Sequence, residues 1–245
     1  MSTPRSNVAL LLADLHLPAG PSPFREAFLA FCKGPAREAA DVYILGDLFE
    51  YWIGDDVGMS IYADETVALL SLTKSGARVH FAHGNRDFLV GDNFFEATGA
   101  QRMDDPTRVE LGGVATLISH GDELCTDDVA YQRWRRFCRW RNGQKVFVAL
   151  PRSFREWVAG GVRKTSLVEK RSKADDIMDV NDGAVRDAFR RSGVTRIIHG
   201  HTHRPGEQHY EIEGRDCERI VLADWRPERM EYLRVDESGA KRIAL

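Results

Sequence analysis

The chain has 245 residues, 43% of them hydrophobic, and a formal net charge of −3. That length suits one large α/β domain, or one domain with an insertion. A chain of this size and hydrophobic content can bury a core without disulfides. Four scattered cysteines form no Cys-x-x-Cys pair, which argues against a structural zinc site and fits a reducing compartment. Residues 1–7 are polar, and no apolar run approaches a secretory or membrane-spanning segment, so we expect a cytoplasmic location.

Short apolar runs, each followed by a polar turn, predict the main strands. They cover residues 8–13, 42–45, 79–82, 116–119 and 196–199. Helical patterns lie between the early strands, at residues 24–32 and 61–75, which favours a parallel or mixed sheet covered by helices. The tail differs, because residues 208–212, 219–223 and 232–236 resemble antiparallel strands, with turns at 213–215 and 237–240.

One segment interrupts this pattern. Residues 129–174 contain 13 Lys and Arg but only two Asp and Glu, whereas the remaining chain contains 21 basic and 35 acidic residues. The segment is rich in aromatic residues and has a helical pattern without a strand signal. We therefore predict a basic helical cap at residues 128–175, inserted into a core formed by residues 1–127 and 176–245.

Residue types that bind metals follow five of the predicted strands. The candidates are Asp14, His16, Asp47, Asn85, His120, His201 and His203. Ligands in open α/β sheets gather outside the carboxyl ends of the strands, so these side chains should meet at one edge. Residues i and i+2 of an extended segment point the same way, which pairs Asp14 with His16 and His201 with His203. Seven oxygen and nitrogen donors are too many for one tetrahedral ion and suit two ions that share a carboxylate.

Each motif has a simpler explanation when it is taken alone. Asp14 and His16 could cap a strand end, Gly-Asp and Gly-Asn are common turns, and His-x-His-x-His could lie on the surface. The ordered set, with each member at a strand end, makes coincidence a poor explanation. For His199, which faces the same side as His201, we favour packing or support of a ligand over metal binding. His80, His83 and His209 lack the strand-end context.

The ordered motifs Asp-x-His, Gly-Asp, Gly-Asn, His and Gly-His-x-His resemble those of the calcineurin-like metallophosphoesterases. The resemblance implies a four-layer α/β/β/α sandwich with a two-metal site. It assigns Asp14, His16, Asp47 and His203 to the first metal. It assigns Asp47, Asn85, His120 and His201 to the second, with Asp47 shared between the two.

Longer motifs narrow the resemblance to the UDP-2,3-diacylglucosamine diphosphatase family of lipid A biosynthesis. They include residues 46–56, with Arg86 after Asn85 where His is common in the superfamily, and residues 125–128, 177–181 and 199–205. Ala13 and Glu50 depart from the family pattern, but neither is a proposed ligand. This resemblance implies hydrolysis of UDP-2,3-diacylglucosamine by water attack at the α-phosphorus, giving UMP and 2,3-diacylglucosamine 1-phosphate. It also implies two divalent ions, with Mn²⁺ expected.

The resemblance further implies which residues act on the substrate. Arg86 would stabilise phosphate charge; a surface ion pair with Asp87 is its simpler alternative. Contacts to the substrate are expected from Asn85, Arg86, Asp128, Ser166, Lys170, Lys173 and His201. The cap would supply an apolar groove for the acyl chains and hold the enzyme, peripherally, on the anionic cytoplasmic face of the inner membrane. A monomer without nucleic-acid partners is expected.

Two other functions remain possible from the sequence. The basic, aromatic cap could bind nucleic acid, which would make the metal site a nuclease or a cyclic-nucleotide phosphodiesterase. A non-catalytic scaffold is the other alternative, although it would be expected to lack at least one ligand, and all seven are present.

Overall fold

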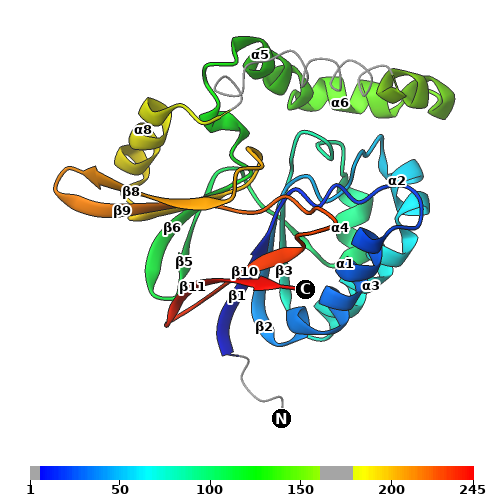
Figure 1. Ribbon diagram of the computed structural model, residues 1–245. Coiled ribbons are helices and arrows are strands. Elements are labelled where there is room, and N and C mark those ends of the chain that lie inside the picture. Colours follow the sequence, from blue (N-terminus) through cyan, green and yellow to red (C-terminus); the bar gives the residue numbers. More distant parts are fainter. Residues whose placement is uncertain (1–5, 161–178) are drawn as a thin grey trace.

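The computed structural model describes residues 6–160 and 179–245, which form two β-sheets flanked by helices (Figure 1). The first sheet has the order β11-β10-β1-β2-β3-β4. Its strands are β1 (Ser6–Leu12), β2 (Ala39–Leu45), β3 (Arg78–Ala82), β4 (Gln101–Arg102), β10 (Glu231–Asp236) and β11 (Gly239–Ala244). Strands β1 to β4 are parallel, and β10 and β11 add an antiparallel edge.

The second sheet has the order β5-β6-β7-β9-β8. Its strands are β5 (Thr107–Leu111), β6 (Val114–Ser119), β7 (Arg196–His199), β8 (Gly206–Ile212) and β9 (Arg215–Val221). The three central strands β6, β7 and β9 are parallel, whereas β5 and β8 pair antiparallel at the two edges. Parallel strands in both sheets therefore bring several carboxyl ends to one end of the molecule.

Helices cover the outer face of each sheet. The first sheet carries α1 (Pro23–Lys33), α2 (Asp55–Ile61), α3 (Ala63–Lys74) and α4 (Asp92–Thr98), and the second carries α8 (Asp182–Ser192). Helix α1 begins where the Ser22 hydroxyl accepts a hydrogen bond from the Arg25 N–H. Helix α8 begins in the same way at Asn181 and ends at Gly193, whose left-handed backbone has a φ of 67°.

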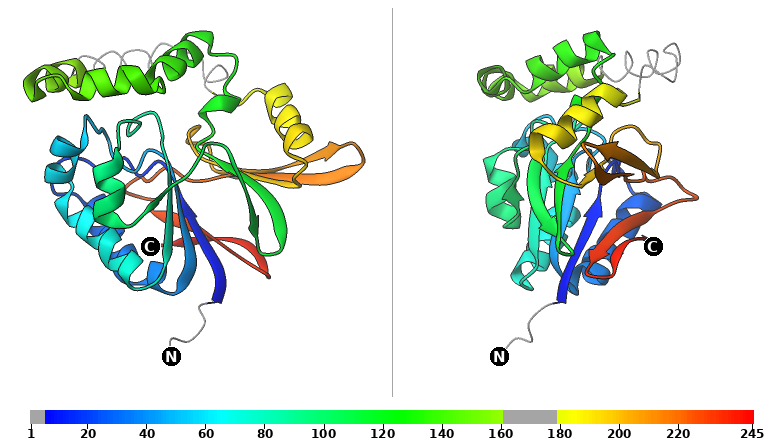
Figure 2. Two further views of the ribbon diagram at one scale, coloured as in Figure 1. Left: turned by 180° about the vertical axis from the view of Figure 1, so that it is seen from behind. Right: turned by 90° about the vertical axis from the view of Figure 1, so that its left-hand side faces the viewer.

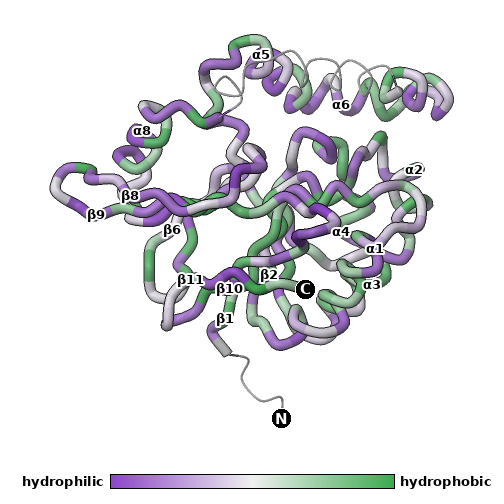
Figure 3. The backbone as a smooth tube through the Cα atoms, in the orientation of Figure 1, coloured by the Kyte–Doolittle hydropathy of each residue, from purple (hydrophilic) through white to green (hydrophobic). Residues whose placement is uncertain are grey.

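Three hydrophobic clusters hold these layers together. The largest lies between the first sheet and its helices, the second fills the space between the sheets, and the third lies beneath α8. Figure 2 shows the same layers from two further directions, and Figure 3 shows hydrophobic residues concentrated in the inner strands. The α/β/β/α sandwich implied by the sequence motifs is confirmed.

The expected strands are all present, with small changes at their ends. The C-terminal strands differ from the expected antiparallel arrangement. Strand β9 is antiparallel to β8 but parallel to β7, and β10 joins the first sheet rather than continuing the second. Strand β11 occupies part of the segment 237–240 that was expected to be a turn. Short strands such as the two-residue β4 had no detectable sequence signal.

Two further helices, α5 (Val129–Cys138) and α6 (Arg141–Val148), lie across the end of the body toward which β1 runs (Figures 1 and 2). Residues 152–160 are also helical. Residues 161–175 of the predicted cap lie outside the described residues, so the proposed cap boundaries remain a prediction. Within the described ranges, no helix has the length and apolar character needed to cross a bilayer.

Candidate metal centre

The predicted ligands lie on tight turns directly after the strands. Five of them adopt a left-handed backbone that side chains rarely take, and these are Asp14, His16, Asp47, His201 and His203. Backbone hydrogen bonds join neighbouring turns, from Asp14 N to Gly46 O at 3.1 Å and from His16 N to Asp47 O at 3.0 Å. The ligand-bearing turns are therefore held in register beyond the ends of the sheets.

Two glycines permit the close approach of these turns. A Cβ atom at Gly84 would lie 2.1 Å from Asp47 Oδ1, and one at Gly200 would lie 2.3 Å from Asp14 Oδ2. Both distances are far below van der Waals contact with a carboxylate oxygen, so a side chain at either position would displace that carboxylate.

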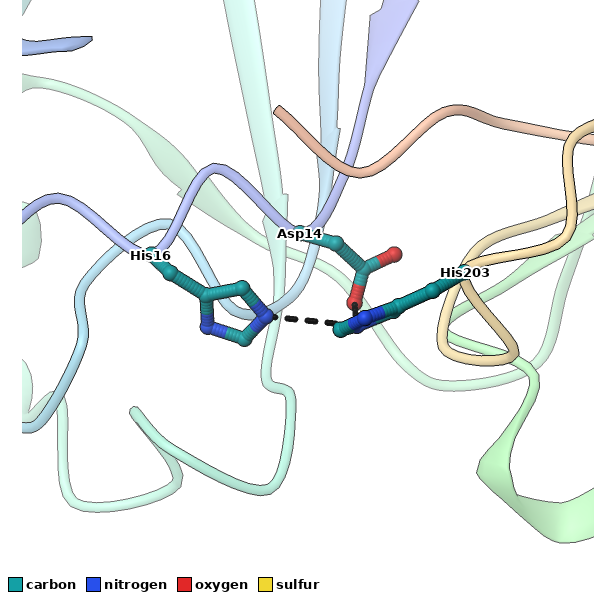
Figure 4. A group of neighbouring side chains, drawn as sticks. All are labelled: Asp14, His16 and His203. Carbon is teal, nitrogen blue, oxygen red and sulfur yellow. Dashed lines mark hydrogen bonds and ion pairs between the residues drawn. The ribbon is translucent and has the colours of Figure 1, made fainter. Parts of the chain in front are cut away.

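One group of donors contains Asp14, His16 and His203, which Figure 4 shows converging from two chain segments. The two imidazole Nε2 atoms lie 3.3 Å apart, and His203 Nε2 lies 3.5 Å from Asp14 Oδ1. The other Asp14 oxygen, Oδ2, accepts a hydrogen bond from His201 N at 2.7 Å. Asp14 Oδ1 and His16 Nδ1 are buried and have no hydrogen-bond partner among the described residues.

The second group contains Asp14, Asp47 and His120. His120 Nε2 lies 3.2 Å from Asn85 Oδ1 and 4.0 Å from Asp47 Oδ1, while its Nδ1 lies 2.9 Å from Leu45 O. A carbonyl oxygen only accepts, so Nδ1 carries a hydrogen, and Nε2 is the nitrogen that faces the site.

Asp47 lies between the two groups. Its Oδ2 is 3.9 Å from His16 Nε2, whereas its Oδ1 faces His120 and also accepts a hydrogen bond from Arg86 N at 2.8 Å. The carboxylate therefore turns one oxygen toward each group. The His201 ring lies beside the His120 ring, with the two centroids 4.9 Å apart in an edge-to-face arrangement.

The electrostatic field of the site is strongly negative. Burial by itself would lower the pKa of His120, but Asp47, Asp14 and other carboxylates outweigh burial and raise that pKa to about 10. Burial lowers the pKa of His16 to about 4 despite the nearby Asp47 and Asp14 carboxylates. Buried carboxylates, imidazole nitrogens and ligand atoms without a hydrogen-bond partner together fit divalent cations, and the predicted ligands include no thiolate.

His199 is buried on β7 and faces protein groups rather than the donors. Its Nδ1 lies 2.8 Å from Gly200 O, and its Nε2 lies 3.5 Å from Arg219 Nη1. Burial and the Arg219 charge lower the pKa of His199 to about 3, so the ring is neutral. This geometry is consistent with the packing role that the sequence favoured.

The substrate-binding candidates are only partly within the described chain. Asp128 caps α5 and accepts a hydrogen bond from Tyr131 N at 3.0 Å. Ser166, Lys170 and Lys173 lie outside the described residues. Asp87 is fully buried, and its carboxylate accepts hydrogen bonds from the N–H groups of Asp47, Leu48 and Gly84. The surface ion pair between Arg86 and Asp87 considered above is therefore not formed.

Several side chains that contact the predicted ligands have no part in the motifs, and Tyr131 and Asp224 are two of them. The Tyr131 ring centroid lies 5.4 Å from that of His201, and an oxygen of Asp224 lies 3.5 Å from His203 Nδ1. Asp224 directly follows residues 219–223, which the sequence predicts as a strand, so its strand-end position is a usable signal. Tyr131 was grouped with the other aromatic residues of the segment, and nothing in its spacing set it apart.

Comparison with known proteins shows the family to which the chain belongs. A family model described as calcineurin-like phosphoesterase matches residues 9–205. A protein from Aromatoleum aromaticum named UDP-2,3-diacylglucosamine hydrolase is 44% identical, over 94% of each chain. Proteins with the same name from Chromohalobacter salexigens and Nitrosococcus oceani are 42% and 45% identical, over 96% and 87% of this chain and 95% and 86% of their own. The chain therefore belongs to the calcineurin-like phosphoesterase family and, within it, to the same family of hydrolases as these relatives.

Proposed function

We propose that the protein hydrolyses the pyrophosphate bond of UDP-2,3-diacylglucosamine by water attack at the α-phosphorus. The products are UMP and 2,3-diacylglucosamine 1-phosphate. The names of relatives that match nearly the whole chain support the substrate. The observation that carries a two-metal mechanism is the Asp47 carboxylate, whose two oxygens face His16 and His120 at 3.9 and 4.0 Å.

In this proposal one ion is held by Asp14, His16, Asp47 and His203, and the other by Asp47, Asn85, His120 and His201. Oxygen and nitrogen donors of this kind suit Mn²⁺. When bound, the two ions lower the pKa of a water molecule and neutralise charge on the phosphoryl oxygens.

The chain's own residues position the reacting groups. The Asn85 and Arg86 turn is fixed by the hydrogen bond from Arg86 N to Asp47 Oδ1 and by the buried Asp87 carboxylate. Burial is the main cause of the low pKa of His16, and the Arg86 charge lowers that pKa further, which supports a cation near the predicted ligands. An arginine stays protonated near neutral pH, so Arg86 stabilises phosphate charge and does not transfer a proton.

A turnover assay with isotopically labelled water tests the substrate and the position of attack. With Mn²⁺ present, the label should appear in UMP, because attack at the α-phosphorus leaves the new oxygen there. Single-stranded DNA and cAMP are the comparison substrates for the nuclease and phosphodiesterase alternatives. Efficient cleavage of those two alone would overturn the lipid assignment.

Arg86→Ala separates the role of this cation from metal binding. Turnover should fall by about 10²- to 10³-fold, as when one charge-stabilising donor is removed, while metal content stays at two ions per chain. Arg86→Lys keeps the charge but not the planar set of donors and should recover only part of the loss. A large loss of metal in Arg86→Ala would instead make the residue structural.

We also propose that the segment 128–175 binds the acyl chains and the anionic membrane surface. Hydrophobic and hydrophilic residues alternate along α5 and α6 (Figure 3). Large aromatic side chains are exposed here, namely Trp134, Phe137, Trp140, Phe154 and Trp157, the last of them 73% exposed. Exposed aromatic rings within a basic segment suit an interfacial site, where each basic residue near an anionic surface contributes about 1 kcal/mol.

Vesicle sedimentation tests this membrane proposal. The protein should sediment with vesicles that contain phosphatidylglycerol more than with purely zwitterionic ones, and Trp157→Ser should weaken the association. The matched control is Val67→Ser, which removes an exposed hydrophobic side chain from α3. If both variants and the wild type sediment equally, Trp157 does not contribute to binding of the membrane surface.

A further inference from the structure

Helix α5 presents one face to the body of the protein. Tyr131, Arg135 and Arg139 recur at intervals of four residues, so they lie on the same side of the helix. All three are partly buried, whereas Trp134 and Phe137, on other sides, are 41% and 62% exposed. The helix therefore separates an outer aromatic surface from an inner polar one.

The inner face meets two buried carboxylates. Arg139 Nη2 lies 2.8 Å from Asp105 Oδ2 and 3.2 Å from Asp122 Oδ1, and Arg135 Nε lies 2.8 Å from Asp122 Oδ1. Tyr131 donates a hydrogen bond to Asp122 Oδ2 at 3.1 Å. Asp105 and Asp122 have side chains only 4% and 1% exposed, so each depends on these cations for its charge.

The same carboxylates contact the turns that carry predicted ligands. Asp105 Oδ1 accepts a hydrogen bond from His120 N at 2.8 Å, and Asp122 follows His120 by two residues. Arg139 Nη2 also donates to His83 O at 3.3 Å, two residues before Asn85. The Tyr131 ring adds its contact with the His201 ring.

These contacts all reach one half of the metal centre. Asn85, His120 and His201 are the ligands that only the second ion uses. Across residues 6–160 and 179–245, no hydrogen bond, ion pair or ring contact joins α5 to Asp14, His16 or His203. The helix is thus attached selectively to the second-ion side.

A third cation site is not the explanation of this cluster. Donor atoms of Asp105, Asp122 and Glu123 lie within 4.8 Å of one another, which alone would suit a metal ion. Two guanidinium groups already occupy the cluster, with Arg135 pairing with Asp122 and Arg139 with both aspartates. The cluster is therefore an internal ion network that ties α5 to the ligand turns.

We propose that Arg139 is a positioning residue that acts through Asp105 on the second-ion ligands, so that docking of α5 and binding of the second ion are coupled. The inference rests on the proposed two-metal function. Coupling of this kind is reciprocal: a docked α5 strengthens binding of the second ion, and the second ion stabilises the docked α5 by the same free energy. A ligand on the outer face of α5 would then influence the metal centre through its inner face.

Arg139→Gln tests the coupling, with Arg136→Gln as the matched control. Arg136 lies on the same helix and carries the same charge, but it is exposed and its Nε donates to Gln132 O within the helix. Mn²⁺ titration followed by electron paramagnetic resonance should show the second ion bound about 10- to 100-fold more weakly in Arg139→Gln, with the first unchanged. In Arg139→Gln, the spectrum of two magnetically coupled Mn²⁺ ions should be replaced by the spectrum of a single isolated Mn²⁺ ion.

A double variant and the wild-type protein complete the test. Adding Asp105→Asn to Arg139→Gln should weaken binding of the second ion no more than the stronger of the two single variants does. Both substitutions remove the same interaction, so their effects should not add. In wild-type protein, filling the second site should slow hydrogen exchange of α5, a measurement that needs no variant to fold.

The outcomes are distinguishable. Wild-type protein that binds fewer than two ions would overturn the two-metal function and this inference with it. The inference alone would be overturned if the wild type binds two ions and Arg139→Gln weakens the binding of both ions equally or of neither. Unchanged hydrogen exchange of α5 when the second ion binds would also overturn it.

Discussion

The Nε2 atoms of His16 and His203 lie 3.3 Å apart, although the two residues are 187 positions apart in the chain. Asp14 Oδ1 lies 3.5 Å from the same His203 nitrogen and has no hydrogen-bond partner among the described residues. The two imidazole nitrogens can share one hydrogen bond, but the carboxylate oxygen beside them has none. A shared cation would satisfy all three at once.

Removal of metal should therefore destabilise the fold. A ligand that binds only the folded state stabilises it by about 2.7 kcal/mol at a free concentration 100 times its dissociation constant. We expect the thermal midpoint to fall after chelation and to rise again when Mn²⁺ is returned. Calorimetry checks this, and identical midpoints with and without metal would contradict a metal centre in the folded protein.

Asp47→Ala should abolish metal-dependent turnover, with a loss of about 10³-fold or more, because one carboxylate faces both groups of donors. Asp47→Asn keeps the side-chain volume and can still accept the hydrogen bond from Arg86 N, yet it lacks the charge. Both variants should retain the circular dichroism spectrum of the wild type. Near-normal turnover with either variant would exclude the shared role of Asp47.

Glu65→Gln should lower the free energy of unfolding by about 3–5 kcal/mol, the usual cost of breaking a buried ion pair. Glu65 is fully buried on α3 and accepts two hydrogen bonds of 2.6 Å from Arg25 on α1. The control is Glu156→Gln, which breaks the exposed pair with Arg152 and should change stability by less than about 1 kcal/mol. Urea unfolding compares the two, and equal effects would mean that the Glu65 pair contributes no more than a surface pair.

Acid should selectively remove the contribution of Asp41. Burial would raise the pKa of Asp41, but hydrogen bonds with His80 and Arg78 outweigh it and lower the pKa from 3.8 to about 2. A lowered carboxyl pKa in the folded state stabilises the protein above pH 3.8, and the stabilisation is lost as the pH falls through about 2. The stability advantage of the wild type over Asp41→Asn should shrink over that range.

Urea midpoints measured at several pH values check the Asp41 prediction. Asp92→Asn is the control, because the ion pair of Asp92 with Arg102 is on the surface and contributes little. A wild-type advantage over Asp41→Asn that grows as the solution is acidified would have the wrong sign and would reject the assignment.

The features that could be predicted from the sequence are those that leave a local pattern in it. Buried parallel strands such as β2 and β7 are short apolar runs bounded by turns, and each is followed by a ligand. The order of the motifs therefore predicts which residues meet at the ends of the strands, and their role as metal ligands stays a prediction. Strand β4, with two exposed residues, and strand β11, with no fully buried residue, owe their structure to a neighbouring strand and carry little signal of their own.

Contacts between distant segments could not be predicted in the same way. The pairing of Arg139 with Asp105, and the approach of Tyr131 to His201, depend on where α5 docks and not on any local spacing. The sequence indicated a basic aromatic segment but not that its arginines divide between solvent and a buried network. Asp87 shows the same limit, because a carboxylate beside an arginine suggests an ion pair until its burial is known.

The left-handed turns have a consequence for the evolution and engineering of the protein. Five of the predicted ligands have backbone conformations that glycine would adopt without strain, and these are Asp14, His16, Asp47, His201 and His203. For an ordinary side chain such a conformation costs about 1–2 kcal/mol per residue. Glycine at such a position would relieve that strain and delete a metal donor in the same step. In metal-free protein, where no bound ion offsets this gain, a search for thermostable variants by stability alone should therefore favour inactive sequences. Such a search has to include activity or metal binding to retain these five residues.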